Sequence, residues 1–144
     1  MSLDGRYDAD NIFAKIIRGE IPCVKVFEDD QVLVFMDVFP QARGHMLVIS
    51  KTSQARNLLE AEAKTLGRLI GATQKAAAAV VAALKPDGVV VTQFNGAPAG
   101  QTVFHLHFHV IPRYEGEGLG RHGEGGMANV EDLKALAAKI SAAL

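Results

Sequence analysis

The chain has 144 residues and a formal net charge of −1, and Cys23 is its single cysteine. A chain of this length fits one domain, which buries roughly 68–70% of the surface of its unfolded form. Nucleic-acid partners call for a clustered basic face, so the small net charge argues against them but does not exclude a small phosphate ligand. One cysteine can form neither an intrachain disulfide nor a cysteine-based zinc site. We therefore expect a cytoplasmic protein.

The N-terminal part of the chain predicts neither export nor membrane insertion. Residues 1–11 include no apolar segment of the kind found in signal peptides, and no apolar run approaches the ~18 residues that a membrane-spanning helix needs. Residues 1–10 are mostly polar, and we expect them to be poorly ordered. Apolar residues at positions 12, 13, 16 and 17 then follow Asn11, a good helix cap, and stop at Gly19, which predicts one short helix.

Three strands and a long helix are expected next. The β-branched and aromatic runs 24–28 and 32–38 predict a hairpin, and residues 46–50 predict a third strand. From residue 58 to residue 84 the apolar positions recur at steps of three and four, which indicates the main helix; its many alanines allow close packing on a sheet. The sequence Lys85-Pro86-Asp87-Gly88 ends this helix, since proline cannot continue it.

The C-terminal part predicts two more strands and a last helix. Residues 89–94 and 103–111 are typical of strands, the second of them ending at Pro112, and residues 95–100 form a loop between them. The glycine-rich stretch 115–126 predicts a flexible link, and the apolar pattern of residues 130–144 predicts a helix. We predict an α+β fold with a mostly antiparallel sheet and helices on one face. Residues 1–10 are assigned as a flexible N-terminus, 11–114 as the domain, and 115–144 as the link and C-terminal helix.

Three histidines stand out in the predicted strand 103–111. His105, His107 and His109 alternate with apolar residues, and because strand side chains have a period of two, the three imidazoles are expected on one face. Histidine can act as nucleophile, base or acid near neutral pH, because its unperturbed pKa is about 6.5. Clustered in this way, the three side chains indicate an active site.

Two other interpretations of these histidines stay open on the residues alone. They could be ordinary strand histidines, or they could bind a metal, since histidines two apart on a strand can chelate zinc or iron. A metal site would gain support from a carboxylate nearby in sequence. The nearest ones, Glu115 and Glu117, lie beyond Pro112 in the glycine-rich stretch.

The segment His105-Leu106-His107-Phe108-His109-Val110-Ile111 resembles the signature of the histidine-triad family, in which three histidines alternate with apolar residues. The resemblance extends from Asn11 to about Tyr114, through stretches such as residues 12–17, 35–37, 44–49 and 100–103. It therefore covers most of the chain and implies the fold of that family. Within the family the chain is most similar to the purine nucleoside phosphoramidases.

The resemblance implies a role for each histidine of the site. The middle histidine, His107, would attack the α-phosphorus and form a nucleotidyl-histidine that water then cleaves. His109 would lie near the phosphate oxygens, and His105 would belong to the set that orients the nucleophile and relays protons. His45 resembles the family's upstream histidine that completes this relay, although it could also be an ordinary histidine at a strand edge.

The resemblance also implies a nucleotide-binding set. Gln101 and Thr102 would hydrogen-bond the phosphate and the leaving group, and the backbone after Gly100 would approach the phosphate closely. Asn95 would contact phosphate or ribose, although asparagine before glycine is also a common turn former. Asp37 would accept hydrogen bonds from ribose hydroxyls. The apolar slot for the base would be formed by residues that, taken singly, are typical of a core: Phe13, Ile16, Phe35, Val38 and Leu47.

One departure from the family pattern concerns metal. Many bacterial relatives carry a Cys-x-x-Cys at the first helix and a further histidine after the third strand, which bind a structural zinc. Asn11, Ala14 and Ser53 stand at those places here, so we predict no structural zinc, no metal at the site and no cofactor. The family also implies a homodimer, for which the alanine-rich helix 58–84 is the candidate contact surface.

Activities other than that of an adenosine 5′-monophosphoramidase stay open. The sequence also resembles dinucleoside polyphosphate hydrolases, of which a diadenosine tetraphosphate hydrolase is the example to test. Family transferases carry glutamine in place of the third histidine, so His109 argues for water as the acceptor. A nucleotide-binding protein without catalytic activity is the third alternative. We expect a purine nucleotide as ligand, and neither nucleic acid nor membrane as partner.

Overall fold

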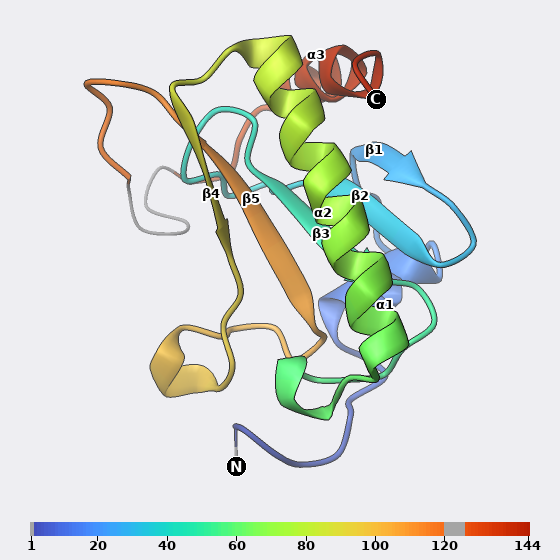
Figure 1. Cartoon of the computed structure of the whole chain (residues 1–144). Coiled ribbons are helices and arrows are strands. Elements are labelled where there is room, and N and C mark those ends of the chain that lie inside the picture. Colours follow the sequence, from blue (N-terminus) through green and yellow to red (C-terminus); the bar gives the residue numbers. More distant parts are fainter. Residues whose placement is uncertain (1, 120–125) are drawn as a thin grey trace.

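The computed structural model describes residues 2–119 and 126–144 (Figure 1). In these ranges five strands form one antiparallel sheet in the order β1-β2-β3-β5-β4. The strands are β1 (Lys25–Glu28), β2 (Val32–Met36), β3 (Met46–Ser50), β4 (Gly88–Thr92) and β5 (His107–Arg113). The predicted α+β class and antiparallel sheet are confirmed, as are the hairpin of β1 and β2 and the third strand.

The two faces of the sheet are covered by different helices. On one face, alternate strand residues such as Val34, Val48 and Val110 share a core with α2 (Ala63–Leu84) and α3 (Val130–Ser141). On the opposite face, Phe13 of α1 (Ile12–Ile17) packs with a second set of strand residues: Leu33, Phe35, Leu47 and Ile49. The expectation that helices gather on one face is therefore wrong for α1. Its Phe13 packs on the strand side chains that point away from α2 and α3.

The long helix begins later than its periodicity suggests. A short 3-10 turn, η1 (Leu58–Glu60), comes first, with the Asn57 side chain accepting a hydrogen bond from the Leu59 N–H. Ala61 and Glu62 then adopt extended backbone, each with ψ of 146°, so α2 starts only at Ala63. Its end is as predicted: Lys85 takes the left-handed conformation (φ 53°) directly before Pro86.

β5 is displaced along the chain from the strand predicted at residues 103–111. The backbone of residues 103–105 bends, and the Leu106 N–H donates to the Ala55 carbonyl, 3.0 Å away, instead of continuing a strand ladder. His105 therefore lies just before the strand. At the other end β5 continues through Pro112 to Arg113, because beyond Val110 it pairs only with β4 and a proline is tolerated where a strand has one neighbour.

The C-terminal helix belongs to the same core as the sheet. Leu133, Ala137 and Ile140 of α3 are buried against α2, β1 and β2, and the Ser141 hydroxyl donates to the Val26 carbonyl. Of the predicted flexible link, residues 120–125 lie outside the described residues, and η2 (Ala97–Ala99) is a short 3-10 turn in the predicted loop 95–100. In the described part of the chain, no helix combines the length and the apolar character that crossing a bilayer requires.

Candidate active site

His107 and His109 lie on the face of β5 that points away from α2. His107 is opposite Ile49 and His109 opposite Leu47 on β3, and the strand period of two places both imidazoles on the side of α1. Their apolar neighbours Leu106 and Phe108 join the core under α2. Both histidines are buried. The alternation seen in the sequence thus places these two histidines on one face of β5 and their apolar neighbours on the other. His105 precedes the strand.

The hydrogen bonding of His107 fixes which ring nitrogen can attack. Its Nδ1 lies 2.7 Å from the His105 carbonyl oxygen. Because a carbonyl can only accept, Nδ1 must carry the hydrogen and donate it, and the neutral ring then has its lone pair on Nε2. The Phe13 ring contacts the imidazole edge-on, with ring centroids 4.9 Å apart. This tautomer, with the lone pair on Nε2, is the one that a nucleophilic role of His107 would require.

A chain of hydrogen bonds sets the tautomer of His109. The Gln41 backbone N–H donates to Nδ1 of His45, 3.0 Å away, so the hydrogen of the neutral His45 ring lies on Nε2. His45 Nε2 is 2.9 Å from His109 Nδ1, which must accept. The hydrogen of His109 is then on its own Nε2. A neutral His109 can consequently donate a hydrogen bond to a ligand oxygen.

Asp37 extends this chain from the end of β2. Its Oδ1 accepts from the Phe39 N–H at 2.8 Å, and its Oδ2 lies 3.4 Å from His45 Nε2. The side chains of Asp37, His45 and His109 are all buried, with one ligand atom of each within 4.8 Å of the others. The fold thus supplies the carboxylate that the sequence around the triad lacks.

This cluster has donors that suit zinc, but its spacing fits hydrogen bonding better. Two nitrogens bound to one tetrahedral zinc, at about 2.0–2.1 Å each, are about 3.3 Å apart. The 2.9 Å between His45 Nε2 and His109 Nδ1 is the length of a hydrogen bond. The expectation of no metal at the site is consistent with this geometry and stays a prediction.

His105 is held from both ring nitrogens. Nε2 donates to the Ser50 carbonyl at 3.1 Å, and Nδ1 lies 2.7 Å from the Tyr7 hydroxyl. Burial lowers the pKa of His105 to about 4, with the neighbouring His107 adding to that shift and the bond to Ser50 opposing it. His105 is therefore neutral at physiological pH, and it reaches His107 through its backbone carbonyl.

A cavity of about 270 Å³ opens beside His107 and His109. Four polar or titratable groups from the predicted set line it: Asp37, Thr102, His107 and His109. The five residues predicted for the base slot also line it: Phe13, Ile16, Phe35, Val38 and Leu47. An apolar cavity with a few polar groups at one end is the usual form of a small-molecule site. A larger cavity of about 440 Å³ between α2, β1 and the C-terminus is lined by apolar residues and Lys75, and it lacks comparable chemistry.

Six further residues line the same cavity without having been predicted: Ile12, Pro22, Cys23, Met36, Phe39 and Val103. Cys23 is half-buried, and burial raises the pKa of its thiol, so it is a thiol and not a thiolate at neutral pH. The position of Ile12 beside Phe13 on a short helix could have indicated it. Met36 and Val103 belong to runs predicted as strands but carry no polar group that would single them out. Pro22, Cys23 and Phe39 lie outside the helices and strands, where no periodic pattern marks them.

Most of the residues predicted to bind the phosphate do not line this cavity. Gln101 is buried, and its side chain bonds to backbone groups of Gly96, Arg56 and Val103. Asn95 accepts from the Leu58 N–H. Gly100 adopts a φ of 112° against Phe94, a conformation that favours glycine. In this set only Thr102 lines the cavity, so the structure assigns Gln101 first of all to bracing the loop.

Tyr7 is the functional candidate that sequence reasoning missed. It stands alone in a polar segment that was expected to be poorly ordered, and no pattern marks it.

At the places where the family resemblance puts zinc ligands, Asn11 caps α1, while Ala14 and Ser53 line a small cavity next to Tyr7 and His105. The prediction that no structural zinc binds there is not tested by this geometry.

The chain resembles known proteins in both sequence and structure. A family model described as HIT domain matches residues 18–116. The crystal structure of a Hit-like protein from Bartonella henselae has a TM-score of 0.91 and 53% sequence identity, covering 97% of this chain and 100% of that one. Adenosine 5′-monophosphoramidase hnt1 of Schizosaccharomyces pombe is 38% identical over 131 residues, 90% of this chain and 95% of that protein. Adenylylsulfatase HINT3 of Arabidopsis thaliana is 39% identical over 119 residues, 78% of this chain and 60% of that protein.

Proposed function

Since the chain belongs to the HIT family, we propose that it is a hydrolase acting at the α-phosphate of purine nucleotides, and specifically an adenosine 5′-monophosphoramidase. The names of hnt1 and HINT3 support an adenylyl substrate. The observation that carries the proposal is the bond from His107 Nδ1 to the His105 carbonyl, because it leaves the lone pair of the neutral ring on Nε2, the atom proposed to attack phosphorus.

The proposed reaction has two displacements. In the first, His107 Nε2 forms a bond to phosphorus as the phosphorus–nitrogen bond of the substrate breaks, and the amine leaves after taking up a proton. In the second, a water oxygen attacks phosphorus, the bond to Nε2 breaks, and the nucleoside monophosphate leaves. Overall one water is consumed, and its hydrogens end on the amine and the phosphate.

The structure suits the charges that appear along this path. In the nucleotidyl-histidine both ring nitrogens of His107 are substituted, so the ring is cationic, and the His105 carbonyl accepts from its Nδ1–H. His109, with its hydrogen on Nε2, can donate to a phosphoryl oxygen on which negative charge builds up. Phe13, Phe35 and Leu47 supply flat apolar surface for the base, and Asp37 is the proposed acceptor for ribose hydroxyls.

The test is release of amine from a fluorogenic adenosine phosphoramidate by the wild type and by His107→Ala. We expect turnover by the wild type and a loss on the order of 10⁴-fold or more in the variant. Rapid quenching followed by mass spectrometry should show a nucleotidyl adduct on the wild type and none on the variant. AMP binding serves as the control, and we expect both proteins to retain it because the variant leaves Asp37 and the five residues of the base slot unchanged.

Wild-type turnover in His107→Ala would contradict the assignment of the nucleophile. Turnover of diadenosine tetraphosphate far faster than that of the phosphoramidate would assign the chain to the dinucleoside polyphosphate hydrolases. AMP binding without turnover of either substrate would identify a nucleotide-binding protein that is not an enzyme.

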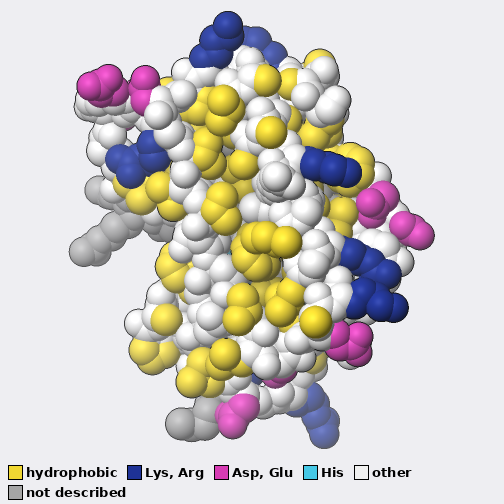
Figure 2. Space-filling view, in the orientation of Figure 1, with side chains coloured by type: hydrophobic (Ala, Val, Ile, Leu, Met, Phe, Trp, Pro, Cys, Tyr) yellow, Lys and Arg dark blue, Asp and Glu magenta, His cyan; other side chains and the backbone are white. Residues whose placement is uncertain are grey.

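The proposal includes a homodimer in the cytoplasm. The outward face of α2 exposes Ile70 and Val81, which are 52% and 44% exposed and lie eleven residues apart, close to three helical turns. Figure 2 shows hydrophobic side chains along this face of α2, in the orientation of Figure 1. A second copy of the chain would cover this apolar stripe.

A further inference from the structure

Tyr7 bonds to a triad histidine from the N-terminal segment, 98 residues away in sequence. Its hydroxyl oxygen lies 2.7 Å from His105 Nδ1, and the two rings are tilted against each other with centroids 5.8 Å apart. His105 is buried. A hydrogen bond of this length to a buried ring nitrogen is a strong positional constraint.

The direction of this bond follows from the other side of the ring. Nε2 of His105 faces the Ser50 carbonyl, which can only accept, so Nε2 carries the hydrogen. Nδ1 of the neutral ring is then an acceptor, and the Tyr7 hydroxyl donates to it. Tyr7 and Ser50 together permit one tautomer and one ring orientation of His105.

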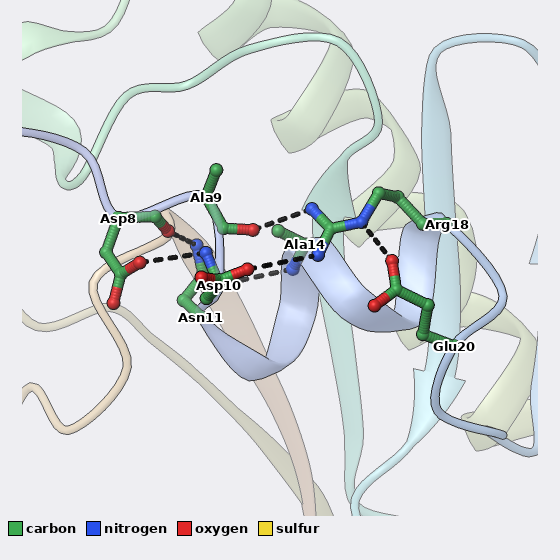
Figure 3. A network of polar contacts seen from close by, with 7 residues as sticks. All are labelled: Asp8, Ala9, Asp10, Asn11, Ala14, Arg18 and Glu20. Atoms are coloured by element: carbon green, nitrogen blue, oxygen red, sulfur yellow. Dashed lines mark hydrogen bonds and ion pairs between the residues drawn. The ribbon is translucent and has the colours of Figure 1, made fainter.

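The segment that carries Tyr7 is fastened on both sides. Figure 3 shows the polar network that ties residues 8–10 to α1: Asn11 bonds to the Asp8 carbonyl and caps the helix, and Arg18 reaches back to the Ala9 carbonyl. On the other side of Tyr7, the Asn57 side chain donates to the Leu3 carbonyl at 2.8 Å. Tyr7 is thus held between two anchor points.

We propose that Tyr7 is a positioning residue of the active site, acting through His105 on the nucleophile His107. His105 lies before β5, so its backbone is outside the strand ladder. The backbone next to it is fixed by the Leu106 N–H bond to Ala55, and the ring by Tyr7 and Ser50. The carbonyl between these two fixed points is the one that accepts from His107 Nδ1. This inference rests on the proposed function, since it assigns Tyr7 a part in the same reaction.

Tyr7→Phe tests the inference because it removes the hydroxyl and keeps the ring. We expect kcat for an adenosine phosphoramidate to fall on the order of 10-fold, since a small misplacement of the nucleophile slows the chemical step. KM should be unchanged, because Tyr7 lines the small cavity behind His105 and not the one beside His107. Tyr114→Phe is the matched control: Tyr114 is the other tyrosine of the chain, and its hydroxyl donates to the Arg43 carbonyl.

A second measurement reports on the bond itself. In ¹⁵N NMR spectra of the imidazoles, His105 of the wild type should show one tautomer, with hydrogen on Nε2 and a hydrogen-bonded, unprotonated Nδ1. Tyr7→Phe should shift the Nδ1 signal of His105 and move that of His107 Nδ1, whereas Tyr114→Phe should change neither. Thermal unfolding of both variants checks that the fold is intact.

The outcomes separate this inference from the proposed function. A wild-type kcat in Tyr7→Phe, or an unchanged His105 spectrum, overturns the role of Tyr7. A wild-type protein that turns over neither an adenosine phosphoramidate nor diadenosine tetraphosphate overturns the proposed hydrolase, and the role of Tyr7 in it, before any variant is compared. Reduced kcat together with a shifted His105 spectrum supports both.

Discussion

His105 makes the stability of the protein depend on pH. Its pKa is about 4 in the folded chain, against an ordinary value of 6.5, because burial disfavours the charged ring. Between these two pH values the unfolded chain binds a proton that the folded chain does not bind. The contribution of a neutral His105 is therefore fully present above pH 6.5 and is lost as the pH falls toward about 4.

We expect this loss to reach about 3 kcal/mol in the free energy of unfolding, as a shift of between two and three pKa units implies. Urea unfolding of the wild type and of His105→Asn, measured between neutral pH and pH about 4, checks it. The variant keeps every carboxylate of the chain, so the difference between the two pH slopes isolates His105. Equal slopes would show that the folded protein accepts the proton as readily as the unfolded chain.

Single residues differ in how far the sequence could place them. The positions of His107 and His109 could be predicted from the strand period of two, which places the histidines on one face and the apolar core residues on the other. Asp37 and His45 were selected by family resemblance, and their juxtaposition comes from the pairing of β2 with β3. Tyr7 and Cys23 could not be predicted, because each is one residue without a pattern and its neighbours in space are far away in sequence.

Among the helices and loops, replacing either of two glycines by alanine should change the free energy of unfolding, and in opposite directions. Gly67 lies on the exposed side of α2, and a Cβ built there meets nothing within 4 Å. We expect Gly67→Ala to stabilise the fold by about 0.5–1 kcal/mol, because alanine restricts the unfolded chain and favours the helix. The midpoint and slope of urea unfolding measure the change.

Gly44→Ala is the matched substitution. Gly44 has a φ of 93°, and a Cβ there would come within 2.7 Å of Leu84 Cδ1 and 3.2 Å of Pro112. Backbone strain and overpacking together should cost about 2 kcal/mol or more. A stabilising Gly44→Ala, or a destabilising Gly67→Ala, would contradict the packing of α2 on the sheet described above.

Elements with local signals were predicted well, and those shaped by distant contacts were not. The end of α1 before Gly19 and the end of α2 at Lys85-Pro86 depend on residues adjacent in sequence, and both were predicted correctly. The break at residues 61–62 interrupts a helical pattern that continues in the sequence. The bend before β5 depends on the bond from the Leu106 N–H to Ala55, 51 positions earlier, which no local pattern contains.

At the scale of the whole molecule, the apolar stripe on α2 predicts the oligomeric state. We expect the wild type to be a dimer at micromolar concentration by light scattering, and Val81→Lys to shift it toward the monomer, because a buried ammonium without a partner is costly at an interface. Met127→Lys is the control, since Met127 is an equally apolar residue, 68% exposed, outside α2. A monomeric wild type would contradict the homodimer.

The strict alternation along β5 limits how this stretch of chain can evolve. Residues 106, 108 and 110 belong to the core under α2, and the two histidines between them face the cavity. Inserting or deleting one residue within 107–110 would turn one of these histidines into the core and an apolar side chain into the cavity. Relatives that keep both histidines facing the cavity should therefore differ here by replacement alone.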